Sequence, residues 1–163
     1  MAELTPLDEK LAEVLGLAQG AQEATKVVAK MEGAEDFADQ LARMTEEAAE
    51  TERRTDAYVD TLEGRKTKIR EMARETKGEA VDMMKTYLAD EEEALDGFEF
   101  LAMAEAGETC HWEIVQKIAD VAGIAEAREL ADSVLEIQRR HVEMVREASL
   151  HLAADEAKEL TSA

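Results

Sequence analysis

The stretch Leu95–Val121, LDGFEFLAMAEAGETCHWEIVQKIADV, decides the fold. Its apolar residues recur every three or four positions, which is the spacing of one face of an α-helix. Glu105 and Glu108 fall in the middle of this face and not on the polar side. A carboxylate in an apolar core is costly unless it has a partner, so we expect the rest of the chain to supply groups that face this pair. The apolar members of the face are Phe98, Leu101, Ala104, Trp112, Val115 and Ala119.

Length and composition favour a single all-α domain over residues 1–163. A chain of 163 residues is long enough to bury a sizeable core. Proline occurs once and aromatic residues make up 4% of the chain, so turns are few and the packing must be mainly aliphatic. No run of β-branched residues between turn signals predicts a sheet. We therefore predict a bundle of α-helices.

The charge balance argues against two classes of partner. The chain has 39 acidic and 19 basic residues, which gives a formal net charge of −20. Nucleic acids and anionic membrane surfaces repel such a surface, so we predict neither as a partner. Acidic residues spread over helix faces are usually a solvated exterior, so the charge alone does not indicate a binding function.

We expect neither a secretory signal nor a membrane span. Its first ten residues, MAELTPLDEK, lack the apolar run of a secretory signal, and its apolar stretches are too short to cross a bilayer. Cys110 is the only cysteine, so no internal disulfide can form. We expect a cytoplasmic protein.

The first half of the chain is predicted to form two helices. Thr5-Pro6-Leu7-Asp8 has the features of a helix start, with Thr5 as the N-cap and Asp8 closing a capping box. This helix should end at Gly33, and a second should run from about residue 35 to 62 and stop at Gly64. The short glycine-centred connection predicts an antiparallel hairpin.

Three more helices are predicted in the second half. Residues 66–88 keep a helical spacing and are rich in basic side chains, so we expect this helix to cover one side or end of the bundle. Asp90 and Glu93 form a second start signal, which precedes the helix of the opening stretch. Gly123 should end that helix. The last helix should run from about residue 125 to 154, and residues 155–163 should fray.

The last helix offers a partner for the two glutamates. His141 lies at the centre of its core face, and Gln138 lies one turn earlier at the edge. Glu108 is about fifteen residues before Gly123 and His141 about eighteen after it, so in an antiparallel pair their heights differ by about one turn or less. We therefore expect Glu105, Glu108 and His141 to meet in the bundle interior.

Such a group of side chains is consistent with a metal site. Carboxylates and a neutral imidazole suit iron, manganese or zinc. The alternative needs no metal, because one glutamate could be protonated and bond to the other or to a His141 imidazolium, with Thr51 and Thr55 completing the network. His111 follows Glu108 in an E-x-x-H pattern at the edge of the face, so it is either a further ligand or a boundary residue.

No other chemistry is indicated. The chain has no glycine-rich phosphate loop, so we predict no nucleotide or organic cofactor. It has no Ser-His-Asp or Cys-His arrangement for nucleophilic catalysis, so no catalytic residue can be assigned and enzymatic activity is left open.

With these elements the chain resembles the ferritin-like superfamily, and within it the stress-associated YciF-like proteins. The resemblance covers about residues 7–152 and is carried by the helix order, the Glu105 and Glu108 pair, the E-x-x-H element ending at His111, and His141. It implies a four-helix bundle of two antiparallel helical hairpins joined by a helical crossover. It also implies a di-iron or di-manganese type of metal site and a role in oxidative or general stress response. As a separate prediction, we expect a homo-oligomer, with a dimer first.

The sequence departs from the ligand set that this resemblance implies. A ferritin-like di-iron site takes a glutamate from each of two helices and E-x-x-H from each of the other two. Here the last helix has Gln138-Arg-Arg-His141, and Glu23 and Glu52 are available only if the helical phase is shifted. The alternative function is therefore a non-catalytic ferritin-like structural or interaction protein that has lost a complete metal site. The polar residues predicted inward on the first two helices are Gln22, Thr25, Thr51 and Thr55.

Overall fold

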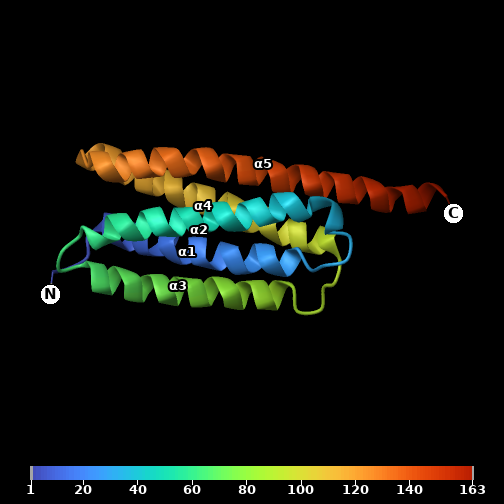
Figure 1. Ribbon diagram of the computed structural model, residues 1–163, viewed down its shortest axis with the longest axis horizontal. Coiled ribbons are helices and arrows are strands. Elements are labelled where there is room, and N and C mark those ends of the chain that lie inside the picture. The colour runs from blue at the N-terminus through green and yellow to red at the C-terminus, as the bar shows by residue number, and fades with distance from the viewer. Residues whose placement is uncertain (1, 163) are drawn as a thin grey trace.

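The computed structural model describes residues 2–162, which form long α-helices and one short 3-10 turn (Figure 1). The all-α prediction is confirmed for this part of the chain. None of the helices in residues 2–162 combines the length and apolar character that crossing a membrane requires. The elements are α1 (Pro6–Val28), η1 (Glu35–Phe37), α2 (Ala38–Asp60), α3 (Lys66–Tyr87), α4 (Ala94–Ala122) and α5 (Ala125–Thr161).

Four helices form a bundle, and the fifth packs against the outside of this bundle and adds Ile69 and Met84 to its core clusters. The most extensive packing within the bundle is between α4 and α5 and between α1 and α2, which form two antiparallel hairpins. Contacts of α1 with α4 and of α2 with α5 close the bundle. The outer helix, α3, packs along α1 and returns the chain to the opposite end, so α2 and α4 run in the same direction (Figure 1).

Glycine lets α3 lie close against α1. A Cβ atom at Gly16 would come 2.4 Å from the Ala73 carbonyl oxygen and 2.7 Å from the Thr76 Cβ, both on α3. No side chain larger than hydrogen fits there without moving the helix. Because α3 contacts α1 far more than α2 or α4, it leaves a groove on each of its sides.

The predicted start of α1 is confirmed. The Asp8 N–H donates to the Thr5 hydroxyl at 3.2 Å, and the Thr5 N–H donates to the Asp8 carboxylate at 2.7 Å. Arg65, at the turn before α3, donates to the same carboxylate at 2.7 Å. This capping box therefore also ties α1 to the connection between α2 and α3.

The predicted start of α4 is wrong. Its N-cap is Glu93, and no side chain caps the helix, so neither Asp90 nor Glu93 forms a capping box. Backbone groups of the loop after α1 bond to the start of α4 instead. The Ala94 N–H donates to the Glu32 carbonyl at 2.8 Å, and the Glu32 N–H donates to the Glu92 carbonyl at 2.9 Å. The two loops thus hold the ends of the hairpins together.

The predicted end of the last helix is also wrong. The last helix does not end near residue 154 but continues to Thr161, and its last turns extend beyond the other helices (Figure 1). A Lys158–Asp155 ion pair of 2.7 Å lies within this extension. Tyr87, in the last turn of α3, is 45% exposed. Trp112, which the spacing placed on the apolar face of the opening stretch, is fully buried.

The core consists of two apolar clusters, one toward each end of the bundle. The cluster around Trp112 includes residues from the first halves of α1 and α5, and the cluster around Phe98 lies at the opposite end of α4. Between them, α4 and α5 bury polar side chains and not apolar ones. The candidate site is this polar layer.

Candidate functional site

The polar layer brings together four side chains from the second hairpin. Glu105 and Glu108 come from α4, and Gln138 and His141 come from α5. Each residue is at most 5% exposed. They meet because the Gly123 turn, with a left-handed φ of 69°, folds α5 back along α4. The structure therefore places Glu105, Glu108 and His141 in one buried group, which we call the polar cluster together with Gln138.

Gln138 joins the two glutamates. Its Nε2 donates to Glu105 Oε2 at 3.0 Å and to Glu108 Oε2 at 3.3 Å, so both amide hydrogens are used. Burial raises the pKa of Glu108 well above its ordinary value, and the neighbouring Glu105 charge raises it further. This environment therefore favours a state in which Glu108 keeps its proton.

His141 lies between two carboxylates. Its Nδ1 is 3.5 Å from Glu105 Oε2, and its Nε2 is 3.0 Å from Glu47 Oε2. An imidazolium can donate to both oxygens, whereas a neutral ring donates to one and presents a lone pair to the other. The ring is thus arranged either to bridge two negative charges or to offer one nitrogen to a cation.

Glu47, on α2, is a site residue that the sequence reasoning missed. Arg43 donates to its Oε1 at 2.6 Å and Arg140 to its Oε2 at 2.9 Å. Burial alone would raise the pKa of Glu47, but these two guanidinium groups and His141 outweigh it and hold the pKa below the ordinary value. Glu47 is therefore a stable negative charge beside the imidazole.

A small pocket opens from the surface to this end of the cluster. Its volume is about 130 Å³, and His141 and Glu47 form part of its wall. It lies where α2 meets α5, and it gives the buried imidazole a contact with solvent-accessible space. The remaining lining residues are Gln40, Arg43, Met44, Arg140 and Met144.

His111 lies away from the polar cluster. Its side chain is 38% exposed, its Nδ1 is 2.8 Å from the Gly107 carbonyl, and its Nε2 is 3.4 Å from Glu13 on α1. The two residues of the E-x-x-H pattern therefore lie in different surroundings, with Glu108 buried and His111 at the surface. The structure does not bring His111 together with the other predicted ligands.

The inward hydroxyl groups of α1 and α2 bond within the first hairpin. Thr55 donates to the Thr51 carbonyl at 2.7 Å, and the Thr25 and Thr45 hydroxyls are 2.6 Å apart. The buried Thr51 hydroxyl has no hydrogen-bond partner within residues 2–162. The network of the metal-free alternative, in which Thr51 and Thr55 would join the glutamates, is therefore not formed.

Glu23 and Glu52 are bound elsewhere. Glu52 accepts hydrogen bonds from Gln19 at 3.1 Å and from Gln22, both on α1. Glu23 forms an ion pair of 3.1 Å with Lys77 on α3. Neither carboxylate joins the polar cluster, so the first hairpin reaches it only through Glu47.

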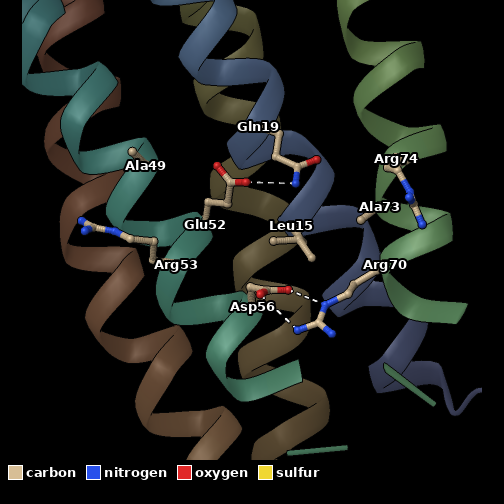
Figure 2. Close-up of a pocket in the computed structure, with 9 residues that line it drawn as sticks. All are labelled: Leu15, Gln19, Ala49, Glu52, Arg53, Asp56, Arg70, Ala73 and Arg74. Atoms are coloured by element: carbon tan, nitrogen blue, oxygen red, sulfur yellow. Dashed lines mark hydrogen bonds and ion pairs between the residues drawn. The ribbon is translucent and has the colours of Figure 1, made fainter. Parts of the chain in front are cut away.

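Figure 2 shows a second, larger pocket, in the groove between α2 and α3. Its volume is about 480 Å³. Both of its carboxylates already accept hydrogen bonds, because Asp56 accepts from Arg70 at 2.7 Å and Glu52 accepts from Gln19 (Figure 2). None of the cluster residues lines it, and it contains no histidine or cysteine. The polar cluster is therefore the stronger candidate site.

As the side chains stand, no three His, Cys, Asp or Glu residues within 2–162 are arranged to hold a metal ion. Comparison with known proteins adds no assignment, since no family model, curated protein or solved structure matches the chain.

Proposed function

We propose that this protein is a ferritin-like metal-binding protein, and that Glu105, Glu108 and His141 hold one ion of iron, manganese or zinc. The observation that carries the proposal is the buried cluster, in which two carboxylates and an imidazole lie between two apolar halves of the core. Oxygen and imidazole donors are those that these metals accept. Burying two carboxylates and an imidazole has a high desolvation cost. A bound ligand explains this burial more readily than a contribution to stability does.

The arrangement of the helices supports the ferritin-like part of the proposal. Two antiparallel hairpins form the bundle, and α3 carries the chain back along its length so that α2 and α4 are parallel (Figure 1). Bundles of this kind place metal ligands on inward faces of facing helices. The polar cluster occupies that position on α4 and α5.

Glu47 has the geometry of a positioning residue for His141. A metal-bound histidine commonly donates its other ring N–H to a carboxylate, which fixes the tautomer and the ring orientation. Glu47 lies 3.0 Å from Nε2, which leaves Nδ1 directed toward Glu105. A neutral His141 held in this way presents its lone pair to the side on which the glutamates lie.

The position of Gln138 favours a site for a single ion. Its amide nitrogen now lies against both glutamates, so the donor types fit a metal but the present side-chain positions do not. Metal uptake requires Gln138 to turn its amide, which would exchange a donating nitrogen for an accepting oxygen. The first hairpin adds no carboxylate beyond Glu47, so a two-metal centre is not proposed.

The biological role that we propose is defence against oxidative stress, which rests on the resemblance to YciF-like proteins. A bound redox-active ion would supply one-electron chemistry toward oxygen or peroxide. The chain itself supplies a dry, apolar surrounding and the small pocket beside His141.

Metal analysis tests the proposal. Protein produced with iron, manganese and zinc in the medium, and purified without chelator, should contain about one ion per chain. Glu105→Ala with Glu108→Ala should abolish this content, while the matched control Glu99→Ala with Glu113→Ala, two exposed glutamates of α4, should retain it. Absence of stoichiometric metal in the wild type, or equal metal in the two double variants, would contradict the proposal.

A metal-free structural or interaction protein is the second candidate, and the hydrogen bonds of Gln138 favour it. They satisfy the glutamates without any ligand. This candidate predicts that Glu105→Gln with Glu108→Gln folds normally, leaves assembly unchanged and shows no metal-dependent change in melting temperature. A melting temperature that falls on chelation in the wild type, and not in this double variant, would exclude it.

A further inference from the structure

The face of α4 opposite the polar cluster is uncharged over its middle third. Between Glu99 and Glu113, the exposed residues of α4 are Met103, Ala106, Gly107 and Cys110. This is unusual in a chain in which 36% of residues are charged. Further along the same face lie two more exposed apolar side chains, Ile114 at 37% and Val121 at 80%.

The spacing of these residues is that of a helix-packing seam. Met103, Gly107, Cys110 and Ile114 follow one another in steps of four, three and four positions, which keeps them on one line along the helix. A Cβ atom built at Gly107 meets no atom within 4 Å, so the line is open to an approaching helix at its centre. We call Met103, Ala106, Gly107, Cys110 and Ile114 the α4 seam.

We propose that a second copy of this chain covers the α4 seam, with the two α4 helices antiparallel and the two-fold axis at Cys110. In a two-fold contact, each residue meets the one equally far on the other side of the axis. This register sets the bulky Ile114 of one copy against Ala106 and Gly107 of the other. Large side chains thus face small ones on both halves of the contact.

Charge also favours a second copy in this register. Lys117 is the only lysine or arginine of α4, and it falls opposite Met103 of the partner, one turn from the partner's Glu99. Symmetry forms this lysine–glutamate pair twice. Two copies of a chain with net charge −20 repel each other least where their surfaces are uncharged, whereas a basic partner would be drawn to the acidic faces instead.

The mass in solution tests the contact. Sedimentation equilibrium should give twice the chain mass for the wild type, and Ile114→Glu should weaken the dimer at least about 100-fold, because it buries a charge at the seam. The matched control is Leu150→Glu on α5, which is 56% exposed and outside the seam, and it should leave the dimer unchanged. Circular dichroism should show equal helicity in all three proteins. A monomeric wild type at about 100 μM, or a dimeric Ile114→Glu, would overturn the proposal.

Disulfide formation tests the register. With diamide as the oxidant, Cys110 on the axis should cross-link to its own copy, because only axial positions bring identical residues within disulfide reach. In a Cys110→Ser background, Met103→Cys alone should not cross-link, but a mixture of Met103→Cys and Lys117→Cys chains should. Equally fast cross-linking of Met103→Cys to itself, or none at Cys110, would contradict this register. Because the seam lies on the opposite side of α4 from the polar cluster, these results do not depend on metal binding.

Discussion

Gln138 occupies the position from which a metal ion would contact the buried glutamates. Its amide donates to both Glu105 and Glu108, where a ferritin-like site would have a carboxylate. Gln138→Glu would complete an E-x-x-H element with His141 and add a third oxygen donor of the correct charge. We expect this variant to bind Mn²⁺ or Fe²⁺ at least about 10-fold more tightly than the wild type, measured by competition with a chromophoric chelator. Unchanged affinity would mean that Gln138 does not occupy the metal position.

The raised pKa of Glu108 predicts the pH dependence of stability. The folded state holds this proton more tightly than the unfolded state, so the protein loses stability as the pH rises from the unfolded pKa through the folded one. Glu108→Gln removes that cost and keeps the shape of the side chain. In the presence of chelator, it should stabilise the protein by about 1–3 kcal/mol at pH 8, and the gain should vanish near pH 4. Urea unfolding at the two pH values measures this, and a loss of stability at pH 8 would contradict it.

At the level of residues, the sequence predicts the buried part of the site better than its edge. Glu105, Glu108 and His141 lie at the centres of their helix faces, so spacing alone brings them together. Glu47 was missed although it is four positions before the inward Thr51, because its long side chain reaches the cluster from the flank of α2. His111 shows the converse, since a motif spacing does not specify on which side of the face a residue falls.

At the level of helices, the contact of α3 with α1 depends on Gly16. A methyl group there would lie 2.4 Å from the Ala73 carbonyl oxygen, so α3 must shift to accept it. We expect Gly16→Ala to destabilise the protein by about 1–3 kcal/mol. The control is Gly78→Ala on the exposed side of α3, where a Cβ meets no atom within 4 Å, and it should stabilise by up to about 1 kcal/mol. Equal effects of the two substitutions in thermal unfolding would rule out the close contact.

Periodicity and caps predicted the helices, but not where α3 lies or where α5 ends. The Thr5 and Asp8 capping box is a local pattern, and it forms as expected. The position of α3 depends on a close approach at Gly16 that hydrophobic spacing does not encode. The extension of α5 to Thr161 depends on a helical preference that its small and charged residues retain without any core contact.

For the whole molecule, the net charge of −20 predicts a marked dependence on salt. Acidic groups repel one another in the compact state, and this repulsion acts over about 10 Å at 0.1 M salt but only about 3 Å at 1 M. We expect the melting temperature to rise between 0.05 and 1 M NaCl, as followed by circular dichroism. A fall would mean that surface ion pairs such as Arg70–Asp56, at 2.7 Å, outweigh the repulsion.

The most direct test of the proposed metal site is anomalous diffraction from crystals grown with Mn²⁺ or Fe²⁺. The proposal predicts one anomalous peak per chain between Glu105, Glu108 and His141, with the Gln138 amide turned from its present position. No peak there, with Gln138 still donating to both glutamates, would show that the cluster is closed by its own hydrogen bonds and binds no metal.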